Sequence, residues 1–452
     1  MRKWTLAAGA LCLAGIAGCT NFLDSTKAVS DPNNPTGATR NQLFAGVQAN
    51  TFGNEEGSLP MLICEWMQQC GGVNGRFVDQ QGTYSINNTT FDLQFNYIYS
   101  AGGLVAIKSI EASADAEGDK QYKGIAEVFE AMDMMYAADI WGDVPYRNAI
   151  GSSSAPTFDP QMQIYGDLLT LLDKAISDLG GSGPGPGSFD LIYGGNTAQW
   201  IQAAHTLKAR IYLHQVEKLG NAQYTSALAE AKLGISTPAN DWKSKHSTST
   251  SQDNMWEQFQ NTSGFGTDLV AGAPLVNIML AQNDPRISQY FGKNPNGGYG
   301  GYDVVTGTTP TAQVSTFTGA GRNSKTFSQP IITYDETQLI IAEASLQTGA
   351  AAAAATALNT VRAEYGKAAI AAPTLNDIMT EKYITTFQNR EAWNDYKRTC
   401  LPVLHPARGK TVIPGRVYYG ATEEQTNSNT PPSSAQNLST VRNANDPNAC
   451  PP

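Results

Sequence analysis

The chain has 452 residues, of which only 15% are charged, and its formal net charge is −10. An acidic chain is a poor partner for nucleic acid or for anionic lipid headgroups, because both carry charge of the same sign. The abundance of Gly, Ser, Thr, Asn and Gln suits a surface that binds a neutral polar ligand, and the length allows one large domain or several ordinary ones.

The first nineteen residues are typical of a bacterial lipoprotein signal. A basic start is followed by an apolar stretch from 6 to 16, which is too short to span a bilayer. Small residues then lead directly into Cys19, so we expect cleavage before this cysteine and acylation of its thiol. The alternative is an ordinary signal peptide that ends near a cysteine by chance. Removal of residues 1–18 changes the net charge to −12. Because no later stretch is apolar for about eighteen residues, the lipid is the expected membrane attachment.

Four cysteines lie beyond the predicted anchor, in a compartment that permits disulfides, and they allow three pairings. Cys64 and Cys70 can pair only if the segment between them is not a regular helix, because six helical residues span about 9 Å. The pairing of Cys400 with Cys450 is favoured, since it would fasten an Asn- and Pro-rich tail to the body of the protein. The spacings do not resemble a zinc site.

Helical periodicity dominates the rest of the chain. Residues 19–40 are polar and rich in turn formers, so we expect a tether there, and from 41 to 140 the apolar spacing is helical. The clearest helices are predicted at 121–140, 161–179, 197–218, 223–233, 336–347 and 350–364. The last four form two pairs that resemble degenerate tetratricopeptide units, which need neighbours to bury their apolar faces. The chain is therefore predicted to be mainly α-helical, with helix pairs near 41–140, 161–233 and 336–400.

The stretch from 236 to 330 differs, because it is rich in Gly, Asn, Ser and Thr and shows little periodicity. A long region without clear elements in a compact domain is usually functional or irregular. We therefore expect an irregular, ligand-facing region here. The sequence GGSGPGPGS at 180–188 predicts a loop, and the tail from 406 to 452 is expected to be mostly irregular.

Patterns that would carry catalysis are mostly absent. Asp139 and Asp143 could form a catalytic or metal pair, but such residues more often bond turn amides and neighbouring basic groups. Glu55 and Glu56 are the other pair that a surface glycoside hydrolase could use, although that reaction needs a fixed separation across a cleft. The four histidines show no HExxH spacing, and no GxSxG elbow appears. We therefore expect no enzyme activity, no metal and no cofactor.

Three segments, taken in order, resemble a known family. They are AADIWGDVPY at 137–146, FDLIYGGN at 189–196 with LKAR at 207–210, and YDETQLIIAEA at 334–344 with LNTVR at 358–362. Two more, FQNREAWNDYKRT at 387–399 and IPGR at 413–416, fit the C-terminal pattern of one branch. The chain resembles the SusD/RagB family of outer-membrane nutrient-binding lipoproteins, and more closely its SusD-like second branch.

The resemblance implies a single domain over 41–452, in which tetratricopeptide-like helix pairs form a right-handed scaffold under an irregular, loop-rich, ligand-facing half. It also implies a partner, a SusC-like TonB-dependent transporter barrel, over which the lipoprotein sits as an extracellular lid. The anchor at Cys19 would then face outward from the outer membrane. Glu336, Glu343 and Arg362, which lie in the matching segments, look like polar partners between packed helices rather than acid or base groups.

Aromatic rings bind sugars by stacking on the apolar faces of the ring, while polar side chains reach the hydroxyls. The candidate ligand contacts in or beside the irregular segments are Trp66, Phe77, Tyr84, Trp256, Phe265, Tyr299 and Tyr302. The last two belong to GGYGGY at 297–302, which would present two rings on a flexible loop. Each ring could instead fill a core or an interface.

The expected function is capture of an extracellular nutrient and its delivery to the transporter. An oligosaccharide is the favoured ligand. A peptide is the alternative, because an acidic groove that retains basic peptides would fit the net charge, and a surface hydrolase is the less favoured third reading.

Overall fold

The computed structural model describes residues 37–78, 82–100, 102–151, 153–261 and 265–451. The predicted signal, Cys19 and most of the predicted tether lie outside these residues.

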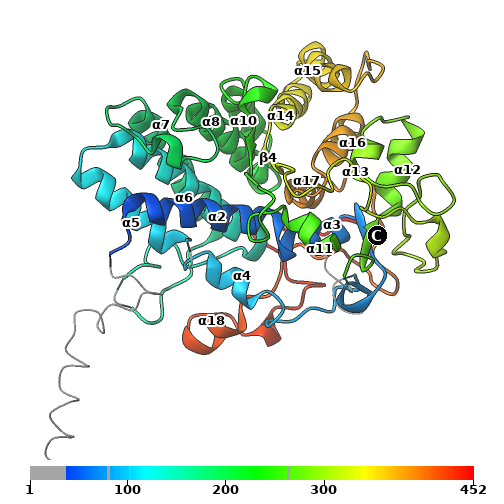
Figure 1. Cartoon of the computed structure of the whole chain (residues 1–452), viewed down its shortest axis with the longest axis horizontal. Coiled ribbons are helices and arrows are strands. Elements are labelled where there is room, and N and C mark those ends of the chain that lie inside the picture. The colour runs from blue at the N-terminus through cyan, green and yellow to red at the C-terminus, as the bar shows by residue number, and fades with distance from the viewer. Residues whose placement is uncertain (1–36, 79–81, 101, 152, 262–264, 452) are drawn as a thin grey trace, which may run out of the picture.

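Long helices that lie side by side form the larger part of the molecule (Figure 1). They are α2 (Arg40–Glu56), α5 (Leu104–Ala116), α6 (Lys120–Trp141), α7 (Gln161–Leu179), α8 (Thr197–His214), α10 (Ala222–Ala231), α14 (Tyr334–Gln347), α15 (Ala351–Glu364), α16 (Leu375–Thr385) and α17 (Glu391–Thr399). Successive helices from α5 to α8 pack on one another, as do α8 with α10, α10 with α14, and α14 with α15. The mainly α-helical prediction and its helix pairs are confirmed.

Local sequence signals explain where the scaffold helices begin and end. In α7 the apolar side chains of Ile164, Leu168 and Leu172 recur at helical spacing and are fully buried. α8 begins where the Asn196 side chain accepts hydrogen bonds from two first-turn amides. The predicted helix at 161–179 has the predicted bounds. The predicted helix at 197–218 is divided at Gln215, and Val216–Leu219 forms a separate short helix, α9.

Residues 236–330 contain more regular structure than predicted. They include α11 (Met255–Asn261), α12 (Ala273–Ala281), α13 (Ile287–Tyr290) and the strands β2 (Trp242–Lys243) and β3 (Leu269–Ala271). These helices have four to nine residues, so they are too short to produce a recognisable period in the sequence. β3 pairs antiparallel with β1 (Cys70–Gly72), and β2 pairs antiparallel with β4 (Pro330–Ile332).

Short elements complete the described chain. They are α3 (Ser58–Trp66), α4 (Asp92–Tyr97), α18 (Ala421–Thr426) and 3-10 turns at Gly187–Phe189, Pro238–Asn240, Thr311–Gln313 and Ser433–Ala435. The first of these turns closes the predicted loop at 180–188, and the tail beyond 406 is mostly irregular, as predicted.

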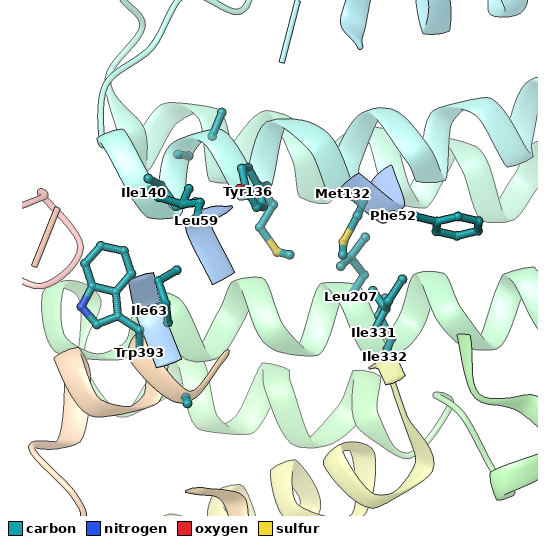
Figure 2. Close-up of a cluster of buried hydrophobic side chains, with 14 of the residues drawn as sticks. Phe52, Leu59, Ile63, Met132, Tyr136, Ile140, Leu207, Ile331, Ile332 and Trp393 are labelled. Carbon is teal, nitrogen blue, oxygen red and sulfur yellow. The ribbon is translucent and has the colours of Figure 1, made fainter. Parts of the chain in front are cut away.

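One large core joins the scaffold to the remaining elements (Figure 2). Its buried side chains include Leu59 and Ile63 from α3, Tyr136 and Ile140 from α6, and Trp393 from α17. The sheet strand β4 adds Ile331 and Ile332. Because α3 and α17 pack on each other, segments more than 300 residues apart in the chain stabilise one another.

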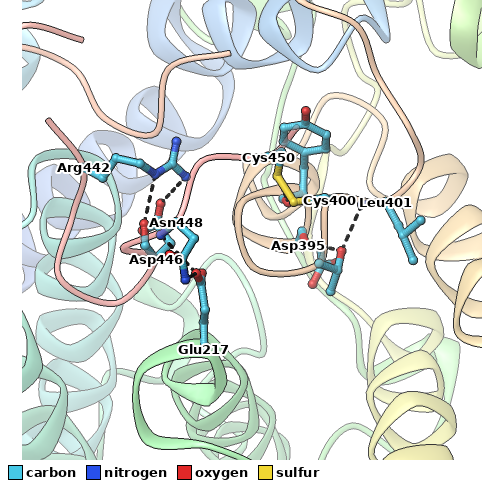
Figure 3. Close-up of a disulfide and its surroundings, with 10 residues drawn as sticks. Glu217, Asp395, Cys400, Leu401, Arg442, Asp446, Asn448 and Cys450 are labelled. Atoms are coloured by element: carbon cyan, nitrogen blue, oxygen red, sulfur yellow. Dashed lines mark hydrogen bonds and ion pairs between the residues drawn. A yellow bond between two sulfur atoms is a disulfide. The ribbon is translucent and has the colours of Figure 1, made fainter. Parts of the chain in front are cut away.

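Both possible disulfides are present in the structure. Cys400 is bonded to Cys450, the favoured pairing, and the bond holds the tail against the end of α17 (Figure 3). Cys64 is bonded to Cys70. This pairing is possible because α3 ends at Trp66, so the segment between the two cysteines is not a regular helix. Figure 3 also shows an ion pair within the tail, between Arg442 and Asp446, and a hydrogen bond from Asn448 of the tail to Glu217.

Candidate ligand-binding site

Three of the predicted ligand-binding aromatics are buried. Trp66 is fully covered, with Trp393 and Tyr84 packed edge-on against it, and Phe77 and Trp256 are less than 5% exposed. Stacking on a sugar needs an open ring face, and these rings have none. In this structure the three rings pack against other parts of the protein and offer no open face for stacking, and their role as ligand contacts stays a prediction.

The other four predicted aromatics are at least partly exposed. Tyr84 accepts a hydrogen bond from the Ala407 amide at 2.9 Å, and its burial raises its pKa. Phe265 is 48% exposed and stacks on Phe259, at 6.1 Å between ring centroids. Tyr299 packs against the main core, and Tyr302 lines a small cavity. Each of the four rings therefore has a protein contact of its own, and their role as ligand contacts stays a prediction.

The GGYGGY segment is fixed rather than free. The Tyr302 amide donates to the Ala271 carbonyl at 2.7 Å, and the Tyr302 carbonyl accepts from the Ala273 amide at 3.0 Å. The Tyr302 side chain rests on Gly71 of β1, where an added Cβ would lie 2.9 Å from the Cβ of Tyr302. Only glycine permits this close approach. The expected flexible loop is thus an ordered extension of the β1–β3 sheet.

This sheet edge, the segment 302–307 and the segment 403–408 enclose two neighbouring cavities. The larger, called here the main cavity, has a volume of about 380 Å³ and is lined by Gln68, Ala273, Pro274, Asn277, Asp303, Val305, Val403, Leu404 and His405. The smaller, the Glu65 cavity, has about 30 Å³ and is lined by Glu65, Gly72, Phe77, Val78, Gly82, Thr83, Tyr302, Val304, Gly307 and Arg408. Successive residues from 302 to 305 line the two cavities in turn, so this segment is the wall between them.

The main cavity has the size and the mixed lining of a ligand site. Val403 is 69% exposed and Val305 is also exposed, which leaves apolar surface open to solvent. The exposed side chains of Asn277 and His405 stand beside them. Gln68 donates to the His405 carbonyl and holds the segment 403–408 against the end of α3. Sequence reasoning missed this site, because its lining residues include no Phe, Tyr or Trp ring and come from four separate segments.

Two further cavities lie near the C-terminal tail. One, of about 350 Å³, is lined by Asp143, Arg416, Tyr419, Arg442 and their neighbours, and another, of about 320 Å³, lies between Tyr99, Pro145 and Thr422. The first is built largely by the tail and the second largely by residues between 96 and 156, whereas the main cavity adjoins the region that the sequence predicted to face a ligand. We therefore take the main cavity as the candidate site.

A buried network of charged side chains surrounds Asp139. His214 places one ring nitrogen 2.9 Å from Asp139 and the other 2.9 Å from Glu391, and Arg390 bonds both Asp139 and Glu55. Burial disfavours the charge on His214, but the two carboxylates outweigh burial and raise its pKa to about 9. The charges are paired, and the network joins α6, α8 and α17.

Asp139, His214 and Glu391 bring three potential metal ligands within 4.8 Å of one another. Their oxygen and nitrogen atoms already bond each other, Tyr165 and Asn394. The guanidinium groups of Arg390 and Arg210 also lie beside them, and their positive charge opposes a bound cation. The group is therefore a set of ion pairs and not a metal centre.

The carboxylate pairs that a hydrolase would need do not converge. Asp143 accepts a hydrogen bond from the first amide of α7, at 2.8 Å from the Gln161 nitrogen, whereas Asp139 bonds His214 and Arg390. Glu55 bonds Arg390, whereas Glu56 bonds His246 at 2.9 Å. The structural role that the sequence favoured for the aspartates agrees with these contacts.

The glutamates and arginine of the matching segments join helices, as expected. Glu336 of α14 bonds Arg210 of α8, and Glu343 bonds Arg398 of α17. Arg362 of α15 bonds Glu381 of α16 at 3.0 Å. No helix in the described part of the chain is long and apolar enough to cross a membrane.

The chain is similar to one family and to several solved structures. The SusD-like_2 family model, described as "Starch-binding associating with outer membrane", matches residues 32–360. A SusD/RagB family protein from Bacteroides thetaiotaomicron is 19% identical with a TM-score of 0.69, over 87% of this chain and 95% of that one. A chitin-binding SusD homolog from Flavobacterium johnsoniae is 19% identical with a TM-score of 0.73, over 89% and 98%. No curated protein matches the sequence.

Proposed function

This chain belongs to the SusD-like_2 family, and from that premise we propose that it binds an extracellular glycan and delivers it to an outer-membrane transporter without breaking a bond. The observation that carries the proposal is the main cavity, where the exposed Val305 and Val403 stand beside Asn277 and His405. Apolar surface covers the C–H faces of a sugar, and polar side chains bond its hydroxyls. The chitin-binding homolog with the same fold supports a glycan as the ligand.

Titration calorimetry of the soluble chain that starts at Thr20 tests this proposal. The ligands are chito-, cello- and malto-oligosaccharides of equal length and a basic peptide. We expect at least one glycan to bind, and Val403→Asp to weaken that binding tenfold or more, because a charge on the cavity wall must be desolvated. Leu233→Asp, the same type of change at an exposed apolar residue of the scaffold, is the matched control and leaves binding unchanged.

Two results would overturn the proposal. Binding of the peptide alone would show a different ligand class. Release of shorter sugars during the titration would show that the protein is a hydrolase.

The cellular arrangement is a second part of the proposal. A lipid on Cys19 holds the protein at the outer membrane beside a SusC-like TonB-dependent barrel, which it covers as a lid. Closure over the ligand requires that the closed state bind it more tightly than the open state. Cys19→Ser is expected to release the protein from the membrane fraction and to prevent its co-purification with a barrel. Membrane retention of this variant would contradict the anchor.

A further inference from the structure

Glu65 is a buried carboxyl group whose oxygens bond no side chain in the described part of the protein. Its residue is 2% exposed, and neither side-chain oxygen has a well-formed hydrogen bond among the described residues, although the Gly72 amide lies close enough to favour the charged form. Glu65 belongs to the lining of the Glu65 cavity. A buried polar atom without a partner costs free energy, so a residue of this kind at a cavity wall calls for a partner that arrives from outside.

Two glycines leave room for this carboxyl group. A Cβ added at Gly72 would lie 2.1 Å from its Oε1 atom, and one added at Gly82 would lie 2.5 Å from the same atom. Any other residue at either position would displace the carboxyl group or close the space around it. The position of Glu65 therefore depends on the absence of two side chains.

The Glu65 cavity admits a substituent and not a ring. Its volume of about 30 Å³ is roughly that of two water sites. Phe77, Val78 and Val304 give it apolar walls, and the partly exposed Gly307 and the exposed Arg408 also line it. A group that fits must be short, with one polar atom for Glu65 and one apolar carbon for the walls.

The charge state of Glu65 limits the polar atom further. Burial raises the pKa of Glu65 well above its usual range, and the nearby Arg76 and the Gly72 amide offset burial only in part. A protonated carboxyl group donates a hydrogen bond, so its natural partner is a neutral acceptor such as a carbonyl oxygen.

We propose that the Glu65 cavity binds the acetyl end of an acetamido group on a glycan whose backbone occupies the main cavity. The acetamido carbonyl accepts a hydrogen bond from Glu65, and the methyl group packs against Phe77 and Val304. The segment 302–305 lines both cavities, so it would contact the sugar ring on one side and the acetamido substituent on the other. This inference rests on the proposed glycan-binding function and adds to it a class of sugar, the N-acetylated hexosamines.

Matched oligosaccharides test the inference by titration calorimetry. Chito- and cello-oligosaccharides of equal length share a linkage and a hydroxymethyl group and differ in the acetamido group. We expect the wild-type chain to bind the chito-oligosaccharide at least tenfold more tightly. Glu65→Gln, which keeps a hydrogen-bond donor, is expected to retain this preference, and Glu65→Leu, which has the same size without a donor, to lose most of it.

A second variant covers the case in which Glu65→Leu does not fold. Val304→Phe fills the Glu65 cavity from its wall and leaves Glu65 unchanged, so it should remove the preference for the chito-oligosaccharide over the cello-oligosaccharide. Val105→Phe, at an exposed position on α5, is the control.

Three outcomes overturn the inference. Equal binding of the two oligosaccharides would remove the acetamido preference while the proposed glycan binding stands. Tighter binding of deacetylated oligomers, lost in Glu65→Gln, would assign the cavity to an ammonium group. Absence of binding by any glycan would overturn the proposed function, and the inference with it.

Discussion

His214 carries a positive charge inside the protein because two carboxylates face its ring nitrogens. Its pKa of about 9 lies above its ordinary value of 6.5, so the folded state binds the proton more tightly than the unfolded chain. The stability contributed by His214 is therefore fully present below pH 6.5 and is lost as the pH rises through 9. The cations lower the pKa values of Asp139 and Glu391 despite their burial, so both stay ionised across this window.

The substitution His214→Gln tests this charge. At pH 6.5 it is expected to reduce the free energy of unfolding by on the order of 3 kcal/mol, and the loss should shrink as the pH approaches 9. Urea denaturation of wild type and variant at several pH values measures the difference. His205→Gln, at a partly exposed histidine, is the control. A loss that is independent of pH would show that His214 is neutral in the folded protein.

For single residues, the sequence predicted the kind of role a side chain has better than it predicted which residues the side chain contacts. It indicated that Asp139 is structural, but its contacts His214, Glu391 and Arg390 lie far along the chain, and nothing local points to them. The sequence could not indicate which aromatic rings are exposed, for the same reason. Trp66 is covered by Trp393, which lies more than 300 residues later in the chain. Burial of a side chain is decided by residues that only the fold brings near.

Asp143 supplies what α7 lacks at its own N-terminus. α7 follows Pro160, which gives no side-chain cap, and the Asp143 carboxylate accepts the first helical amide instead. Negative charge at a helix N-terminus is also favoured by the helix dipole. The short segment after α6 is thereby joined to the start of α7.

We therefore expect Asp143→Ala to destabilise the protein by about 1 kcal/mol. Asp143→Asn keeps an acceptor and should lose only part of this. Thermal or urea denaturation of the two variants measures the difference. Equal losses in both would mean that the hydrogen bond does not contribute.

A carboxyl group at the contact between α5 and α6 works against stability. Burial and the neighbouring Glu130 raise the pKa of Glu111 to about 9, and the opposing effect of Lys108 is smaller. The unfolded chain releases this proton near pH 4.5, so the folded protein loses stability relative to it as the pH rises from 4.5 to 9.

Glu111→Gln replaces the titrating carboxyl group by a neutral amide, so the free-energy cost of burying this group no longer depends on pH. The variant is expected to be more stable than wild type by about 2 kcal/mol at pH 8, with little gain near pH 4.5. Urea denaturation at both pH values tests this, and Glu117→Gln, an exposed glutamate just beyond α5, is the control. A variant less stable than wild type at pH 8 would show that the bond to Lys108 outweighs the cost of burial.

Elements were predictable in proportion to their length. α7 has the predicted bounds because its nineteen residues repeat an apolar pattern several times. The helices α11, α12 and α13 were missed because four to nine residues repeat it twice at most. The candidate site depends on these short elements and on the pairing of β1 with β3, so it was also out of reach of periodicity.

Over the whole molecule, the Cys400–Cys450 disulfide encloses the tail in a closed loop. The two cysteines are 50 residues apart, and closing a loop of that length restricts the unfolded chain by about 4 kcal/mol in the chain-entropy treatment. The Cys64–Cys70 bond spans six residues, for which the same treatment gives about 2 kcal/mol.

Replacing both cysteines of each pair by alanine compares the two bonds. The loss of unfolding free energy should be about twice as large for the Cys400–Cys450 pair as for the Cys64–Cys70 pair, measured by urea denaturation under oxidising conditions. A larger loss from the short loop would show that packing around Cys64 and Cys70, and not chain entropy, dominates.

The tail also fixes the order in which the molecule can be completed. The Asn443 side chain donates to the Asp139 carbonyl, 304 residues earlier, and the Asn445 side chain donates to the His214 carbonyl, 231 residues earlier. A ribosome produces the scaffold helices long before it produces these two asparagines. The centre of the protein must therefore wait, partly unsatisfied, until the tail has been synthesised. A chain cut short before Asn443 would carry every scaffold helix and still lack the contacts that close their centre.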